Sequence, residues 1–514
     1  RAGTGKRLRP EDASDALGRD RINFPLKSNQ TSFSPRKLDP SCPFPLRRSL
    51  NPRSIMNGIQ SAQPMAIPSW VMLDQLFLYK DQISFRADGE TSAETQDTNG
   101  QPVRVSFDIQ SPPGSSRLCL HFPAERESSY WDFVVAAHRD AVRFRIEVDF
   151  DGLPVERAAT DYFVYRARSS SSGPKLTLLP LCYSTSAEIL KAAHDDASWR
   201  GKWRMVTSSD IGLLAAGGAE QKFVVAELCV DTWSAADKTA PLEAELFRLI
   251  SSSSPASANG GDQWELTRAS SHDGKVRFQD IVGWESHRVV PFTTYLCWAD
   301  YNQGVLFCDV SSKAPHLEYL PLPVDDMPRE DFPTFSRTLC LTNKGRTMKF
   351  VKVSKTPSCS NCNPGLGFTI SVHTMEWINC DVKSWVVDVK ITEKTLWAME
   401  GYNLDHLPCS VPLHPLVSMD DPHILYFVLT GRSSLSDETV WIVTLDIARN
   451  TVLSYGGIKG FPSDNIFNGF GFFPSDFTNY LIKHSRENVV LKEKKRITNK
   501  ESTTSRKWAF GLGH

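Results

Sequence analysis

The chain has 514 residues, of which 40% are apolar and 23% charged, and its formal net charge is −1. This composition is ordinary for a folded protein, and a chain of this length can bury a large core as several domains or as one repeat architecture. No apolar run approaches the ~18 residues of a membrane-spanning helix, so we expect no membrane span.

The charge is distributed unevenly along the chain. Residues 1–65 contain twelve Lys and Arg against five Asp and Glu, and residues 483–514 contain nine against three, which leaves about −14 on residues 66–482. Binding of a nucleic-acid backbone depends mainly on Lys and Arg. We therefore expect no nucleic-acid partner for the acidic body at 66–482.

The two basic ends are predicted to be disordered tails. Residues 21–65 are rich in Ser, Pro and Arg, which also fits an organellar transit peptide. Because the sequence starts with Arg1, residues 1–65 need not be part of the mature protein, and Met56 and Met65 are candidate starts. The cluster Lys492–Arg496 has the composition of a nuclear import signal or of a solvated tail.

The cysteines favour a reducing compartment. Eleven of them are spread irregularly from Cys42 to Cys409, unlike the disulfide framework of a small secreted domain. We expect Cys229 and Cys308 to act as small apolar residues in strands. The predicted location is the cytoplasm, the nucleus or both, or an organelle if 21–65 is a transit peptide.

Alternation of apolar and polar residues dominates the body from its start. It is clearest at 103–109, 144–150 and 368–372. A period of two buries one face of a strand and is typical of antiparallel sheets. Helical spacing is scarce and is clearest at Ser186–Asp195, so the predicted fold class is mainly β.

Several hairpins recur along the body. Residues 385–396 and 441–452 share one pattern of alternate apolar positions after a Trp, and looser relatives lie at 131–148 and 305–320. Repeated hairpins predict a β-propeller-like array of blades, with two packed β-sandwich domains as the alternative. The polar inserts at 88–102, 169–174 and 251–263 are predicted to be loops between strands.

Three passages resemble a plant family, expanded in grasses, that carries domain of unknown function 1618. They are Pro68–Asp74, Leu296–Val310 with the following Leu317–Pro323, and Asp421–Phe427. The resemblance implies that this domain covers about 297–425 within the body. Family members are similar to the kelch-like propellers that follow F-boxes, although residues 1–65 show no F-box. The family has no established activity, so the resemblance implies no functional residues.

The middle passage predicts two local features. Residues 300–303 read as a polar turn closed by Gly304, because glycine tolerates a positive φ. Pro321 and Pro323 are expected to end a strand, because proline cannot donate to the ladder.

Candidate metal and redox groups are few. Cys359 and Cys362 have the spacing of half a zinc site, but Cys380 and Cys409 are single and distant and His373 lies in a strand pattern. A zinc site, a redox pair and a surface loop all remain open for this pair. Gly365 and Gly367 lack the third glycine of a dinucleotide site.

Two further groups have metal-ligand side chains. Asp420, Asp421 and His423 surround Pro422, which marks a turn into a strand, and His194 to Asp196 end the short helix. We assign neither to a metal. Trp264, Trp385 and Trp441 begin strands and are expected to pack in the core. We therefore predict no catalytic residue, cofactor or metal ligand.

The predicted function is a non-enzymatic protein-interaction scaffold with an unknown protein partner. A propeller presents loops on a rigid frame, which suits partner binding. The alternative is a propeller enzyme or carbohydrate binder with a central-channel site. That alternative predicts Asp, Glu, His or Tyr side chains with perturbed pKa values at the channel mouth.

Overall fold

The architecture is taken from a computed structural model of the chain. It describes residues 67–122, 132–148, 159–167, 173–180, 211–215, 222–230, 237–251, 263–271, 275–324, 329–355, 367–378, 382–433, 437–458 and 471–481. All of them lie within the compact unit Ala66–His514. The two predicted tails and the Ser186–Asp195 helix lie outside the described residues. No helix in the described part of the chain is long and apolar enough to cross a membrane.

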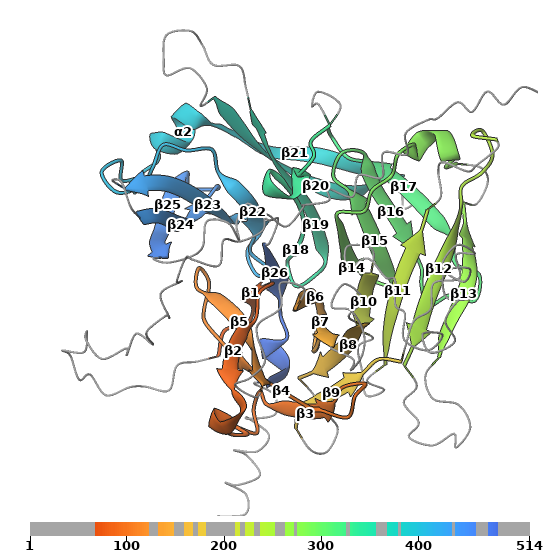
Figure 1. Cartoon of the computed structure of the whole chain (residues 1–514). Helices are drawn as coiled ribbons and strands as arrows, with labels where there is room; N and C mark the ends of the chain where they lie inside the picture. Colours follow the sequence, from red (N-terminus) through yellow and green to blue (C-terminus); the bar gives the residue numbers. More distant parts are fainter. Residues whose placement is uncertain are drawn as a thin grey trace, which may run out of the picture. The chain divides into compact units, whose positions relative to one another are not determined.

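The strands form six small sheets (Figure 1). Five of them are four-stranded antiparallel meanders, in which each strand pairs with the next along the chain. The meanders are β6(Phe133–His138), β7(Ala141–Val148), β8(Ala159–Arg166) and β9(Lys175–Leu178); β10(Ile211–Ala215), β11(Phe223–Cys229), β12(Glu243–Ile250) and β13(Trp264–Ser270); β14(Arg288–Phe292), β15(Tyr295–Asp300), β16(Gly304–Cys308) and β17(Leu317–Pro321); β18(Arg337–Thr342), β19(Thr347–Lys355), β20(Phe368–Ile378) and β21(Val382–Thr392); and β22(Leu413–Val417), β23(Ile424–Ser433), β24(Asp437–Asp446) and β25(Thr451–Ile458).

The sixth sheet joins the two ends of the folded body. Its order is β26–β1–β5–β4–β3, with β2 also paired to β5. β1 pairs antiparallel with β26, about 400 residues later in the chain, and parallel with β5. The strands are β1(Val71–Asp74), β2(Leu78–Asp81), β3(Ala93–Gln96), β4(Pro102–Asp108), β5(Ser115–Phe122) and β26(Phe472–Ser475), and the short helices are η1(Gln82–Ser84), η6(Phe278–Ile281), η7(Pro333–Phe335) and α2(Glu393–Trp397).

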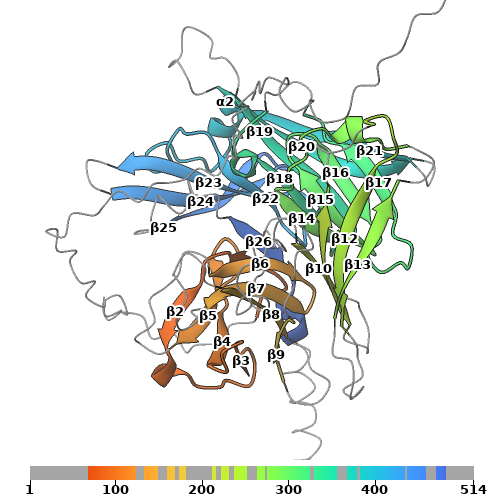
Figure 2. The same ribbon diagram turned by 45° about the vertical axis from the view of Figure 1, so that its right-hand side comes forward.

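The six sheets are the blades of a closed ring. The innermost strand of each blade contacts that of the next in the order β6, β10, β14, β18, β22, β26 and back to β6. Figures 1 and 2 both show these strands around a common centre, with the other strands of each blade farther out. The predicted mainly β propeller is confirmed, and the ring replaces the alternative of two sandwiches.

The core lies between neighbouring blades. Strand β4 shows why: Val103, Val105 and Phe107 are buried on one face, while the residues between them are half-exposed. Apolar clusters of this kind fill the junctions between blades. Each buried Val or Phe contributes roughly 1.5–3 kcal/mol, so burial between blades holds the ring together.

The repeat at Trp385 and Trp441 is only partly a structural repeat. Trp441 lies in β24, which turns into β25 as predicted. Trp385 lies in the outermost strand β21, and α2 follows instead of a return strand. The hairpin prediction at 385–396 is therefore wrong. Alternate apolar positions fit any blade strand, whereas Thr392 caps α2 by accepting a hydrogen bond from the Thr395 N–H.

Other local predictions have mixed outcomes. The hairpins at 131–148 and 305–320 are present as β6–β7 and β16–β17. Residues 88–102 contain β3, which pairs with β4, so the loop prediction is wrong there. The inserts at 169–174 and 251–263 connect paired strands, although their central residues lie outside the described ranges.

Gly304 is needed for space rather than for a left-handed backbone. It starts β16 without a positive φ, and an added Cβ would lie 2.3 Å from the Tyr319 ring and 2.7 Å from the Leu320 carbonyl oxygen. The predicted reason for this glycine is therefore wrong. The predicted end of the next strand is confirmed, because β17 ends at Pro321.

Candidate functional site

A cavity of about 140 Å³ lies on the axis of the ring. Every blade contributes its innermost strand to the wall, represented by Val135, Ile211, Val289, Thr338, Leu416 and Phe472. The lining residues come from the beginnings of these strands. Because strand direction alternates within a blade, the connections from each outermost strand arrive at this same end. The cavity therefore lies near the face built by the blade-to-blade connections.

Arg288 crosses the cavity from one blade to the opposite one. It begins β14, and its Nη2 donates to the Phe472 carbonyl oxygen of β26 at 3.2 Å. Its guanidinium also lies 4.3 Å from the centroid of the Phe473 ring. Strands β14 and β26 are three steps apart in the six-membered ring, so this side chain spans the axis. Arg288 is half-buried, and no described carboxylate forms an ion pair with it.

His287 stands next to Arg288 and is fixed in the cavity wall. Its backbone N–H donates to the Ala299 carbonyl oxygen, and its Nδ1 accepts from the Tyr301 N–H at 3.2 Å. Burial lowers the pKa of His287 to about 4; the Glu285 carboxylate opposes this shift, and the guanidiniums of Arg329 and Arg337 add to it. His287 is therefore neutral at pH 7, with its proton on Nε2.

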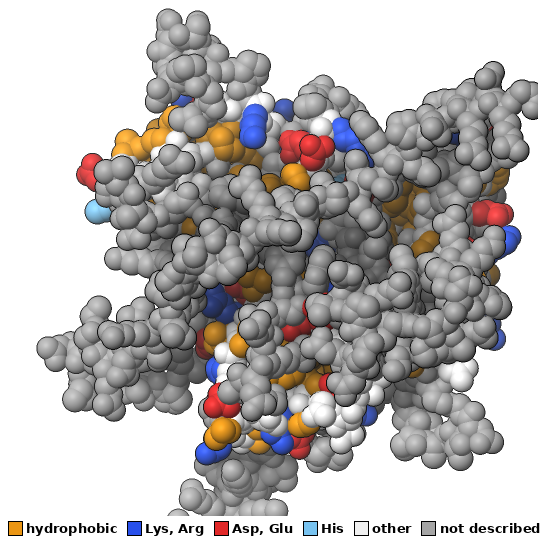
Figure 3. All heavy atoms as spheres, in the orientation of Figure 1, with side chains coloured by type: hydrophobic (Ala, Val, Ile, Leu, Met, Phe, Trp, Pro, Cys, Tyr) orange, Lys and Arg blue, Asp and Glu red, His pale blue; other side chains and the backbone are white. Residues whose placement is uncertain are grey.

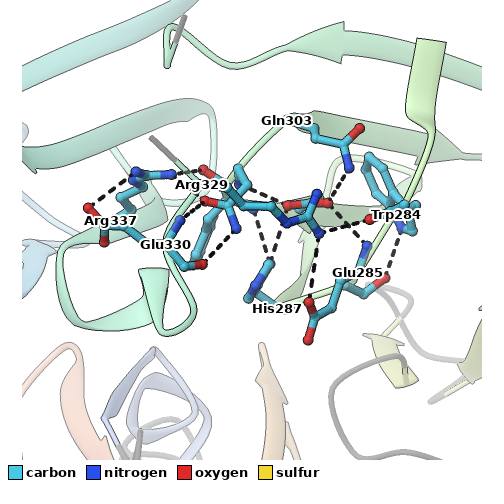
Figure 4. Close-up of polar contacts among 12 residues, drawn as sticks. Trp284, Glu285, His287, Gln303, Arg329, Glu330 and Arg337 are labelled. Atoms are coloured by element: carbon cyan, nitrogen blue, oxygen red, sulfur yellow. Dashed lines mark hydrogen bonds and ion pairs between the residues drawn. The ribbon is translucent and has the colours of Figure 1, made fainter. Parts of the chain in front are cut away.

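Asp300 holds the turn that faces His287. Its carboxylate is fully buried and accepts from the Asn302 N–H, the Gln303 Nε2 and the Glu285 N–H. Its Oδ1 lies 3.5 Å from the His287 Nδ1. Burial raises the pKa of Asp300, and the backbone hydrogen bonds oppose the shift. Figure 4 shows Glu285, His287 and Gln303, the residues whose backbone or side chains surround this carboxylate.

Arg337 is a buried cation whose charge is compensated. Its Nη1 donates to the Tyr301 carbonyl oxygen and to Asn302 Oδ1, each at 2.8 Å. Its Nη2 lies 3.3 Å from Glu330 Oε1 (Figure 4), and the Arg337 side chain is only 1% exposed. This ion pair links the β17–β18 connection to the first residue of β18.

Tyr301 completes the wall. Its ring stacks on His287 with centroids 5.8 Å apart, and its hydroxyl accepts from the Leu339 N–H. Burial raises the pKa of Tyr301, so this side chain is also neutral at pH 7. The wall thus contains the neutral side chains of His287 and Tyr301, the ion-paired Arg337, and one cation, Arg288, that lacks a counter-charge among the described residues.

The candidate residues predicted from sequence do not meet here. Asp420, Asp421 and His423 form the predicted turn before β23, where Asp421 Oδ1 accepts the His423 N–H. Cys359, Cys362, Gly365, Cys380 and the group 194–196 lie outside the described residues. Among the residues that are described, no three His, Cys, Asp or Glu side chains are placed to hold a metal ion.

The remaining candidates are structural. His373 is buried on β20, and burial lowers its pKa to about 4. Trp385 and Trp441 are half-buried against the clusters between blades, and Trp264 donates from Nε1 to the Pro180 carbonyl oxygen. Cys308 is buried in β16, and Cys229 lies in β11 as predicted but is exposed at the last residue of that strand.

Sequence reasoning missed the cavity residues His287, Arg288 and Arg337. A signal exists in hindsight, because each basic residue comes at the start of an apolar strand. A basic residue can equally begin an outer strand, which does not reach the axis of the ring. The position of the strand within its blade decides whether that residue lines the cavity.

The fold and the cavity define a six-bladed β-propeller with a basic axial site. Residues 298–426 match the family model described as protein of unknown function (DUF1618). This match bears out the predicted resemblance to domain of unknown function 1618 within these residues, which run from β15 to β23. No curated protein matches the chain.

Proposed function

We propose that the protein is a non-enzymatic scaffold that binds another protein at the face where the innermost strands begin. The observation that carries this proposal is the exposure of Phe332. It is 65% exposed in the β17–β18 connection and stacks on Phe335, with ring centroids 5.9 Å apart. Phe335 in turn packs edge-on against His414, a residue of the cavity wall. An exposed aromatic residue on a rigid support is typical of a binding hot spot.

Two other connections on this face expose apolar side chains. Val282 is 42% exposed between β13 and β14, and Leu404 is 61% exposed between β21 and β22. With Phe332 they place apolar groups on three successive blade-to-blade connections. Exposed apolar groups beside a concave site support protein binding.

The chemistry of the cavity favours binding over catalysis. General acid–base catalysis is most effective when the pKa of the group lies near the operating pH. The pKa of His287 is lowered to about 4 and that of Tyr301 is raised, so both move away from neutrality. None of the described residues that line the cavity is acidic. These side chains suit recognition by hydrogen bonding better than proton transfer.

The charge distribution supports a protein partner rather than a nucleic acid. Residues 66–482, which contain all the described residues, carry a net charge of about −14. Figure 3 shows acidic as well as basic side chains on one face of the molecule. A phosphate backbone is bound mainly by clustered Lys and Arg.

The test is affinity capture from native tissue with three forms of the full chain. Phe332→Ser removes the exposed ring, and Leu453→Ser is the matched control, because Leu453 is 53% exposed on an outer strand. We expect to find a partner protein that wild type and the control capture and that Phe332→Ser does not. The purified partner should bind wild type and the control with similar affinity and Phe332→Ser more weakly. Equal recovery of every captured protein by all three forms would contradict the proposal. Ubiquitin-ligase subunits among the lost proteins would support the likeness to F-box-associated propellers.

A further inference from the structure

We propose that the axial cavity binds a carboxylate group through Arg288. We infer that an Asp or Glu side chain of the scaffold's protein partner supplies this group. Only this assignment of the source depends on the function proposed above. The carboxylate chemistry follows from the charges, geometry and size of the cavity itself.

Among the described residues of the wall, the charges leave one cation without a counter-charge. The Arg337 guanidinium lies 3.3 Å from the Glu330 carboxylate, and His287 uses Nδ1 to accept the Tyr301 N–H. Arg288 has only a carbonyl oxygen and an aromatic ring as described partners. One guanidinium matches one carboxylate, because its planar fork pairs with the two carboxylate oxygens.

The geometry of Arg288 is prepared for such a ligand. The hydrogen bond to Phe472 and the contact with the Phe473 ring hold its guanidinium at the axis. A guanidinium has five N–H donors in a planar fork that fits two carboxylate oxygens. Because the fork is already fixed, little side-chain freedom is lost when an anion binds. The neutral His287 offers a further donor, Nε2–H, in the same wall.

The size of the cavity fits a side chain rather than a large ligand. Its volume of about 140 Å³ corresponds to roughly ten water positions, at ~10–15 Å³ for each. That space accepts a carboxylate and the few carbons attached to it. The apolar wall residues Phe133, Val135 and Leu416 suit those carbons.

The first experiment measures the thermal midpoint of the full chain with succinate. We expect succinate to raise the midpoint of wild type by about 1–3 °C at ten times its dissociation constant. Arg288→Lys, which keeps the charge, should bind more weakly, and Arg288→Gln should bind at least tenfold more weakly than wild type. No rise in wild type, or an equal rise in Arg288→Gln, overturns the proposal.

A second comparison needs no variant and holds even if Arg288→Gln does not fold. Dimethyl succinate has nearly the same carbon skeleton but no charge. It should leave the midpoint of wild type unchanged, and a rise equal to that given by succinate overturns the proposal.

A third experiment identifies the source of the carboxylate. Peptides that bind the full-length protein are selected from a library of short random peptides, and each is retested with its Asp or Glu replaced by Asn or Gln. Acidic peptides that bind wild type but not Arg288→Gln support a partner side chain. Binding of succinate through Arg288 without any selected peptide supports the cavity and contradicts the scaffold. Peptides that bind wild type and Arg288→Gln equally support the scaffold and overturn the carboxylate site.

Discussion

His287→Asn should make the protein less sensitive to acid. In the folded state the His287 Nδ1 accepts the Tyr301 N–H, and an Asn side-chain oxygen can occupy nearly the same position. Burial lowers the pKa of His287 to about 4, whereas an unfolded histidine titrates near 6.5. Between these values the unfolded state binds a proton that the folded state does not. The wild type therefore loses stability as the pH falls from about 6.5 towards 4.

The size of this effect follows from the two pKa values. At pH 7.5 the histidine is neutral in both states and contributes almost nothing to pH dependence. At pH 5 the difference between a pKa of about 4 and one of 6.5 corresponds to about 2 kcal/mol of unfolding free energy. The side chain is only 9% exposed, so solvent screening reduces the value little.

Urea unfolding at pH 7.5 and pH 5 measures the effect. The loss between the two pH values should be about 2 kcal/mol smaller for His287→Asn than for wild type. His423→Asn is the control, because His423 is exposed and should leave the loss unchanged. Carboxylate titration is common to all forms and cancels in the comparison. If Asp300 instead stabilises a charged His287, the variant will be as acid-sensitive as wild type or more so, which would refute the assignment of a neutral ring.

Three further substitutions test the ring and its axis by urea unfolding. Gly304→Ala should lose about 1–3 kcal/mol because its Cβ meets a ring and a carbonyl, whereas Gly456→Ala, with no atom within 4 Å of the added Cβ, should change little. Phe477→Ala should lose about 3–5 kcal/mol, because this fully buried ring packs in the cluster beside the paired strands β1 and β26, and Leu453→Ala should stay within about 0.5 kcal/mol. Arg337→Met should lose about 3 kcal/mol, since it leaves buried acceptors without a donor. If Gly304→Ala, Phe477→Ala or Arg337→Met leaves the free energy of unfolding unchanged, the packing described for that residue is contradicted.

Much of the fold is readable from the sequence, because alternation fixes the buried face of each strand. The segments at 103–109 and 144–150 gave β4 and β7 in this way. The closure of the ring is different. β26 has only four residues and contains Pro474, and it pairs with a strand about 400 residues away. No local pattern carries that information.

The candidate site was less readable than the fold. An Arg before an apolar strand looks the same in an outer strand as in an inner one, so the sequence does not show that Arg288 reaches the axis. The polar turn at Asp300 was predicted, but its neighbour His287 directly precedes the adjacent strand β14, and spacing does not reveal that pairing with β15. The groups that attracted attention by spacing, such as Asp420 and His423, serve a turn.

Hydrogen–deuterium exchange on the complex with the captured partner tests the central claim most directly. If the partner binds the face where the innermost strands begin, exchange should slow in the described connections 275–287, 329–336 and 398–412. The outer strand β21, where Val386 and Val387 are also exposed, should show no change. Protection confined to β21 and the other outer strands would contradict the account.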